Sequence, residues 1–194
     1  LARFECRPSR ENDMRMDKPI LFSSKIVTCL RPAETSDREA TFSLYEELFR
    51  NHIEQIWGWD DDWQSQNFET DWTESDFEII EFGGVQVGYL QTQLRSDPKH
   101  LFVINLGLRS QFQDQGIGTE VMHILETRAG NLDVPIRLNV FRTNPAALRF
   151  YTRLGYEQDE VTESGAILIR KSSTESENPT GEQADASKPD PASS

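Results

Sequence analysis

The sequence predicts an α/β domain over residues 25–171, in which helices flank a mixed sheet. Strand-like and helix-like runs alternate along this stretch, which is typical of that fold class. Gly83 and Gly84 separate two strand-like runs, and this is a hairpin signal because both glycines accept positive φ. Ser36 and Glu39 have the spacing of a capping box, which indicates the start of a helix.

The predicted elements follow one another in the order β-α-α-β-β-β-α-β-α-β-β. Strands are expected at 25–31, 77–82, 85–94, 100–108, 135–141, 156–161 and 166–171. Helices are expected from Ser36 to about Arg50, from 52 to 68 with an interruption at Gly58, from 116 to 130 with Gly130 as C-cap, and from Asn144 to Gly155 with Pro145 in the first turn.

The two ends of the chain differ from this domain. Residues 1–24 are expected to form a weakly ordered N-terminal extension. Residues 172–194 contain no large apolar residue and are expected to be a disordered polar tail. The length of 194 residues therefore corresponds to one folded domain with two tails.

Composition excludes several classes of function. The formal net charge of −13 makes nucleic acid a poor partner, because phosphate binding needs a basic face. Cys6 and Cys29 form no CxxC pair, and the three histidines have no metal-ligand spacing, so no metal site is expected. No apolar run is long enough to cross a membrane, and the first residues do not resemble a secretory signal. We expect a soluble, cytoplasmic protein.

The segment QDQGIGT, residues 113–119, lies between a strand-like and a helix-like run. A helix N-terminus carries free N–H groups and a partial positive charge, and it binds anions. Gly116 and Gly118 would let the backbone approach such an anion closely. The segment is neither a dinucleotide fingerprint nor a P-loop, since it lacks a third glycine and a following Gly-Lys-Ser/Thr. A simple turn remains the alternative.

A second segment, NPAALRFYTRLGY, follows about 25 residues later and contains Asn144, Ala147, Tyr151, Gly155 and Tyr156. Together the two segments resemble the GNAT superfamily of acyl-CoA-dependent N-acyltransferases. That family has a Gln/Arg-x-x-Gly-x-Gly/Ala loop and an Asn-x-x-Ala-x-x-x-Tyr-x-x-x-Gly-aromatic helix. The resemblance covers residues 25–171, including the order of the elements, and it implies the GNAT-like α/β fold, a mixed, mostly antiparallel sheet flanked by helices.

This resemblance implies an N-acetyltransferase that moves an acetyl group from acetyl-CoA to a primary amine by direct attack in a ternary complex. The CoA pyrophosphate would be bound by the backbone amides of Gln113, Asp114, Gln115, Gly116, Ile117, Gly118 and Thr119. The alternative function is a non-catalytic CoA-binding sensor or interaction module on the same fold.

The remaining implied roles lie on the preceding strand and the later helix. Main-chain groups of Leu106 and Leu108 would hydrogen-bond the pantetheine, and the Leu108 N–H would polarise the thioester carbonyl. Asn144 and Ala147 would complete the cofactor site, and Tyr151 would protonate the leaving thiolate. Without a ligand, Asn144 would be only an N-cap and Tyr151 only a core aromatic residue.

The general base is left open. Many members of the family carry a glutamate on the strand before the glycine loop, but here Asn105 is the only polar side chain within FVINLGL. The alternatives are Glu81, an acidic residue within 54–62 acting through water, and His52.

The acceptor side is expected in the segment HIEQIWGWDDDWQSQNF. Ten acidic residues and no Lys or Arg occur between Glu54 and Glu81, and all four tryptophans lie there. Aromatic faces beside carboxylates suit an ammonium group, although the tryptophans could equally be core and the aspartates a solvated face. The IWGWD run also resembles a group of bacterial GNAT proteins. We expect a cationic small molecule or a protein or peptide amine as acceptor, and a monomer or homodimer.

Overall fold

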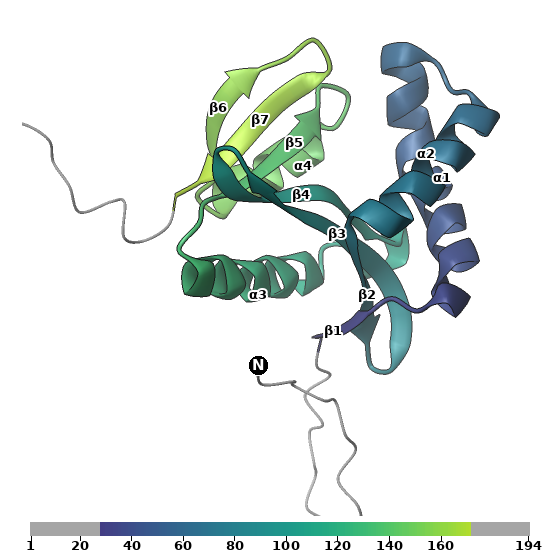
Figure 1. Ribbon diagram of the computed structural model, residues 1–194, viewed down its shortest axis with the longest axis horizontal. Helices are drawn as coiled ribbons and strands as arrows, with labels where there is room; N and C mark the ends of the chain where they lie inside the picture. Colours follow the sequence, from purple (N-terminus) through teal and green to yellow (C-terminus); the bar gives the residue numbers. More distant parts are fainter. Residues whose placement is uncertain (1–27, 172–194) are drawn as a thin grey trace, which may run out of the picture.

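The computed structural model describes residues 28–171 (Figure 1). The strands are β1 (Thr28–Pro32), β2 (Asp76–Phe82), β3 (Val85–Ser96), β4 (Lys99–Leu108), β5 (Ile136–Phe141), β6 (Glu157–Val161) and β7 (Gly165–Arg170). The helices are α1 (Arg38–Trp57), α2 (Asp61–Glu74), α3 (Ile117–Leu132) and α4 (Pro145–Arg153). The predicted fold class and element order are confirmed. The predicted extension at 1–24, the polar tail at 172–194 and the start of the first strand lie outside the described residues.

The seven strands form one sheet in the order β1-β2-β3-β4-β5-β7-β6. Every neighbouring pair is antiparallel except β4 and β5, which run parallel. A parallel pair needs a crossover connection, and α3 supplies it. The one parallel junction therefore lies in the middle of the sheet.

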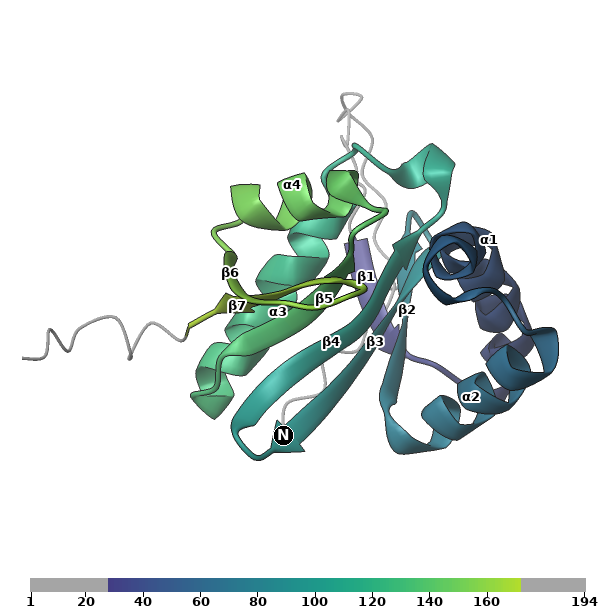
Figure 2. The same ribbon diagram turned by 90° about the horizontal axis from the view of Figure 1, so that it is seen from above.

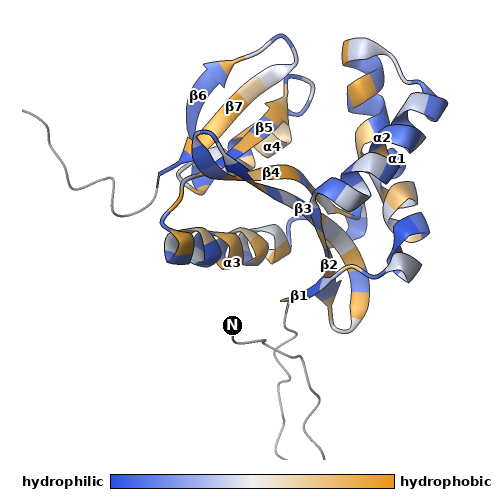
Figure 3. Cartoon of the chain, viewed as in Figure 1, coloured by the Kyte–Doolittle hydropathy of each residue, from blue (hydrophilic) through white to orange (hydrophobic). Residues whose placement is uncertain are grey.

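Helices cover both faces of this sheet (Figure 2). Leu44 of α1 and Phe68 of α2 pack on Ile79 and Tyr89 on one face. On the other face, the larger core joins the sheet to α3 and α4. Apolar and polar residues alternate along α3 (Figure 3), and its apolar residues Val121, Met122 and Leu125 are buried, as expected for an amphipathic helix.

The hairpin at Gly83 and Gly84 is confirmed. Both residues are left-handed, with φ of 62° and 77°, and they join β2 directly to β3. Paired positive φ matches the twist of the flanking strands, which is why two glycines are favoured there.

Several predicted helix ends were wrong. The capping box on Ser36 and Glu39 does not form, because the N-cap of α1 is Asp37, whose carboxylate accepts the N–H of Glu34 at 2.8 Å. A 3-10 turn over 35–37 precedes the helix.

The end of α3 also differs: the helix continues past Gly130 to Leu132 and is capped by left-handed Asp133, with φ of 50°. The Val134 N–H then reaches the Ala129 carbonyl, which lets Val134 enter the core. Gly58 does interrupt the first two helices as predicted, with φ of 87°, although α1 extends well beyond Arg50.

Candidate active site

The strands β4 and β5 pair over only three residues each. Leu101–Val103 face Ile136–Leu138, and no pairing follows toward the carboxyl ends. Where the pairing stops, β4 carries a bulge: Gln91 of β3 faces Asn105 and Thr92 faces Val103, so Ile104 is the additional residue. A bulge bends its strand and increases the local twist. The end of β4 therefore lies beside an opening in the sheet.

The backbone of β4 is directed into this opening. The Leu101 N–H donates toward the β5 side, and the Arg109 N–H donates toward β3. The backbone groups of successive residues in a strand point to alternate sides, and the additional residue at Ile104 shifts this alternation by one residue. The backbone groups of Leu106 and Leu108 consequently face the β5 side, where no strand pairs with them.

The loop before α3 has the shape of an anion cradle. Asp114 and Gly116 are both left-handed, with φ of 56° and 84°. Left-handed residues among right-handed ones turn successive N–H groups to one side. The amides of Ile117, Gly118 and Thr119 add to this set, because the first amides of a helix have no intrahelical acceptor.

The two glycines of the loop are required for different reasons. A Cβ on Gly116 would meet nothing within 4 Å, so its positive φ alone favours glycine. A Cβ on Gly118 would lie 3.2 Å from Cζ of Phe150, so that glycine permits the close approach of α4 to α3.

Gln113 and Gln115 differ from the rest of the predicted loop. The Gln113 N–H already donates to the Ser110 carbonyl, and its side chain donates to the Leu108 carbonyl at 2.9 Å. The Gln115 side chain donates to the Gln111 carbonyl. Gln113 thus ties the loop to the end of β4, while Gln115 lies outside the groove described next.

A groove of about 400 Å³ runs between the loop, the end of β4 and α4. This size is within the range of small-molecule sites. The groove brings together most of the predicted cofactor residues: Leu106, Leu108, Gln113, Asp114, Gly116, Gly118, Thr119, Asn144, Ala147 and Tyr151. Gln115 and Ile117 do not line it, and the Ile117 side chain is buried in the core.

The predicted set of cofactor-binding residues did not include three lining residues, Ala146, Phe150 and Arg153. They are spaced by four and three residues along α4, so they share one face of that helix. Helical spacing counted from the Asn144 motif could have found them.

Asn144 and Tyr151 lie at opposite ends of α4. The Asn144 Oδ1 accepts the Ala147 N–H at 3.0 Å, which confirms the N-cap, and its side-chain nitrogen makes no hydrogen bond within residues 28–171. The Tyr151 side chain is buried, and its hydroxyl has no hydrogen-bond partner among the described residues. Burial raises the pKa of Tyr151, because the phenolate would be poorly solvated, so the hydroxyl stays protonated near neutral pH.

A second cavity of about 80 Å³ occupies the opening between β4 and β5. Phe49 of α1 lines it from one face of the sheet, and Ala147 and Tyr151 of α4 line it from the other. It shares Leu106, Asn144, Ala147 and Tyr151 with the groove. The two hollows therefore adjoin at the tyrosine.

Three of the acidic candidates for the general base, Glu81, Asp60 and Asp61, are held by other groups. Arg31 Nε donates to Glu81 at 2.8 Å. Asp60 caps α2 by accepting the Trp63 N–H at 2.9 Å, and Asp61 accepts from Arg50.

The two uncharged polar side chains considered near the general base, Asn105 and His52, differ in position. The Asn105 side chain donates to Gln91 Oε1 at 2.6 Å. His52 lies beside the cavity: its ring is 6.1 Å from the ring of Phe141, a cavity residue at the end of β5.

The four tryptophans do not form one cluster. Trp72 packs on Phe77, and Trp59 packs on Tyr45 while its Nε1 donates to Asp61. Trp63 is exposed.

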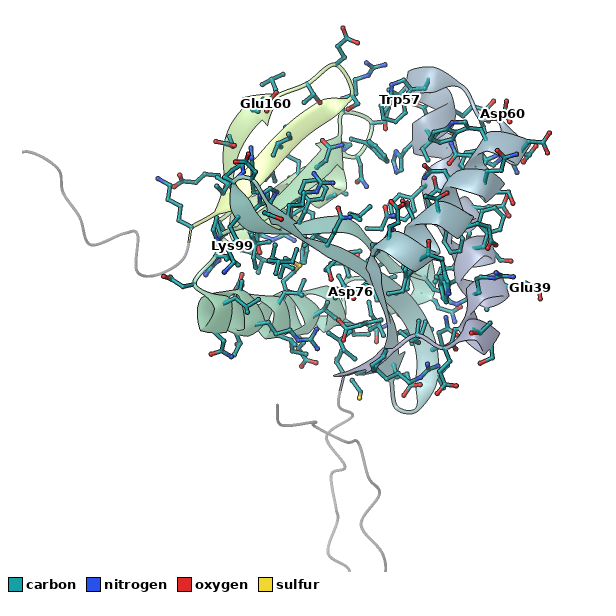
Figure 4. All side chains as sticks on the ribbon, viewed as in Figure 1. Glu39, Trp57, Asp60, Asp76, Lys99 and Glu160 are labelled. Atoms are coloured by element: carbon teal, nitrogen blue, oxygen red, sulfur yellow. The ribbon has the colours of Figure 1, made fainter. Side chains whose placement is uncertain are left out.

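Trp57 is 62% exposed and meets the edge of Phe141, with ring centroids 5.8 Å apart. Figure 4 shows Trp57 on the strand side of α1 and Asp60 further out. Within residues 28–171 no three potential metal ligands gather, and no helix there has the length and apolarity to span a bilayer.

Comparison with known proteins decides the family. The family model described as the acetyltransferase (GNAT) family matches residues 38–156, which is more than half of the chain. The chain belongs to the GNAT family. No curated protein matches the sequence at a significant level. The narrower likeness of the IWGWD run to one group of family members stays a prediction.

Solved structures share the GNAT fold with this chain. The PaiA N-acetyltransferase of Thermoplasma acidophilum in complex with coenzyme A is 14% identical, with a TM-score of 0.61, and the match covers 75% of this chain and 99% of that one. An acetyltransferase of Thermus thermophilus is 18% identical, with a TM-score of 0.60 and coverage of 75% and 97%. Naa50 of Arabidopsis thaliana, in complex with the bisubstrate analogue CoA-Ac-MVNAL, is 14% identical, with a TM-score of 0.54 and coverage of 74% and 98%.

Proposed function

We propose that this GNAT protein is an N-acetyltransferase that moves an acetyl group from acetyl-CoA directly to a primary amine. The observation that supports this most strongly is that the groove and the small cavity adjoin at Leu106, Asn144, Ala147 and Tyr151. A thioester bound along the groove would bring its acyl carbon to that junction. An amine could reach it from the α1 face, so both substrates would meet in one ternary complex.

In this proposal the cradle at Asp114 and Gly116–Thr119 binds the pyrophosphate of CoA. The pantetheine lies along the unpaired edge of β4, with the Asn144 side-chain nitrogen as a further donor. The Leu108 N–H polarises the thioester carbonyl and stabilises the oxyanion that forms on attack, an effect that typically contributes about 3 kcal/mol.

Tyr151 would supply the proton for the leaving thiolate. The raised pKa of Tyr151 keeps its proton available at neutral pH but makes it a weak acid. A thiol has an ordinary pKa near 8.5, below that of the tyrosine, so this proton transfer is uphill on its own and must be coupled to the loss of a proton from the attacking nitrogen. The proton that the attacking nitrogen loses returns to the phenolate, and the tyrosine is regenerated.

The acceptor would be a cationic small molecule or a protein or peptide amine. The net charge of −13 attracts ammonium groups, and Trp57 offers an exposed aromatic face beside the cavity. Asp60 and Asp61 contribute less to this argument than the sequence implied, since both already have structural partners.

The test is release of CoA thiol from acetyl-CoA with a panel of polyamines, amino acids, amino sugars and peptides, against a blank without acceptor. Tyr151→Phe should lower kcat by about 10²-fold, because it removes only the proton donor. Tyr156→Phe is the matched control: Tyr156 is also buried, its ring lies 5.7 Å from that of Tyr151, and it does not line the groove.

Equal turnover by Tyr151→Phe and the wild type would refute the catalytic assignment. CoA binding without thiol release for any amine would favour the sensor alternative.

A further inference from the structure

The cavity between β4 and β5 holds no carboxylate. Among its lining residues, only Tyr151 carries an ionisable side chain. An aliphatic amine is an ammonium ion at neutral pH and cannot attack until it loses a proton. The reaction proposed above therefore needs a base that reaches the cavity from a neighbouring position.

His52 occupies such a position. It follows Phe49 by three residues on α1, so the two side chains share a helix face, and Phe49 lines the cavity. The imidazole lies against Phe141 at the end of β5, and Trp57 meets Phe141 as well. Thr143, next to the cavity residue Asn144, places its Oγ1 2.9 Å from His52 Nδ1.

This contact leaves one ring nitrogen for a ligand. Within residues 28–171, His52 makes no other hydrogen bond, so Nε2 is unoccupied. When Nδ1–H donates to the Thr143 oxygen, the lone pair of the neutral ring lies on Nε2, which is the form a general base requires.

The surroundings favour the neutral ring. Burial lowers the pKa of His52 below its ordinary value, since the imidazolium would be poorly solvated. The charged side chains nearest in sequence on the two packed elements are Arg50 and Glu54 of α1 and Arg142 of the β5–α4 loop. Arg50 is paired with Asp61, and Arg142 donates to a backbone carbonyl of the β6–β7 turn.

We propose that His52 is the general base that deprotonates the acceptor ammonium, and that Thr143 is the positioning residue that fixes its tautomer. This rests on the acetyltransferase function proposed above. His52 Nε2 takes a proton from the ammonium, and the freed lone pair forms the C–N bond as the C–S bond breaks. Tyr151 protonates the thiolate and regains a proton from the new amide nitrogen. His52 releases its proton to water, so the net products are the amide, CoA thiol and one proton.

The experiment compares two acceptors of similar shape, benzylamine and O-benzylhydroxylamine. The first is an ammonium ion at neutral pH, and the second is already neutral. His52→Gln should lower kcat/KM for benzylamine by about 10²-fold while changing that for O-benzylhydroxylamine by less than about threefold. His123→Gln, an exposed change on α3, is the matched control and should alter neither.

The pH profile separates a chemical role from a structural one. With benzylamine, wild-type kcat/KM should rise through the lowered pKa of His52 and then level off near neutral pH. The His52→Gln profile should instead keep rising in proportion to the free amine. Thr143→Val should lower the plateau value of kcat/KM for benzylamine about tenfold, and Thr143→Ser, which keeps the hydroxyl, should have the wild-type value.

Equal loss with both amines, or a wild-type profile in His52→Gln, would overturn the proposal. If the wild type acetylates neither amine, the pair is replaced by an ammonium and a neutral amine of one shape from among the acceptors found above. A second measurement needs no turnover: with CoA bound, benzylamine should shift the imidazole resonances of His52 and lower its pKa. Unshifted resonances would also overturn the proposal, whereas the absence of thiol release with every amine would count against the acetyltransferase function itself.

Discussion

Gly116 offers a direct test of the anion cradle, because its left-handed backbone can be perturbed without a steric clash. With φ of 84° and no atom within 4 Å of the position that an added methyl group would take, Gly116→Ala changes only the conformational preference. A non-glycine residue in this region costs about 1–2 kcal/mol. Alanine also lowers the entropy of the unfolded chain, which offsets about 0.4–1 kcal/mol. The expected net loss is about 1 kcal/mol.

This loss should appear in either of two measurements. If the alanine loop keeps its shape, the free energy of unfolding falls by about 1 kcal/mol, and Tm falls by about 3 °C for a domain of this size. If the loop relaxes, stability is preserved, but CoA must restore the left-handed backbone on binding, and Kd rises by up to about fivefold. The CoA-bound protein loses the same free energy in both cases.

Denaturant unfolding and calorimetric titration with CoA together measure both quantities. Gly116→Asn is the matched variant. Asparagine adopts the left-handed region more readily than alanine, so this variant should lose less stability or less affinity for CoA than Gly116→Ala. The reasoning is refuted if Gly116→Ala matches the wild type in stability and in affinity for CoA.

Two further predictions concern the first helices. Asp60→Ala removes the N-cap of α2, which accepts the Trp63 N–H, and should lower the free energy of unfolding by about 1 kcal/mol in urea denaturation; Asp60→Ser should recover most of it. The Arg31 guanidinium holds the pKa of Asp37 below its usual range, so the stabilisation from this ion pair is present above about pH 4 and is lost as pH falls through the lower folded pKa. Asp37→Asn should be less stable than the wild type near neutral pH and should lose less stability on acidification. If the free energies of unfolding of the two proteins depend on pH in the same way, the prediction is contradicted.

The parts of the site that the sequence predicted depend on short spacing. The loop needs glycine at Gly116 because of one backbone angle, and the start of α4 needs Asn144 because of one hydrogen bond three residues away. Such requirements are satisfied locally, so they are visible as residue types at fixed distances along the chain.

The helix ends were harder to predict because several residues could serve. Glycine is the usual residue beyond a helix end, and Gly130 was chosen on that basis. The helix instead ends at Leu132 with Asp133 as its C-cap, since this ending lets Val134 enter the core. Tertiary packing determines which of two locally acceptable helix ends forms, and this cannot be inferred from a single sequence.

The most consequential feature that the sequence did not reveal is the bulge at Ile104. Before it, Val103 enters the core beneath α3; after it, Asn105 is paired with Gln91. Without the additional residue, strict alternation would exchange the directions of every following side chain and backbone group on β4. Leu106 and Leu108 would then present their backbone groups to β3 and not to the opening. The bulge therefore determines which edge of β4 is left for a ligand, and the hydrogen bond between His52 and Thr143, 91 residues apart, joins α1 to the β5–α4 loop beside the same opening.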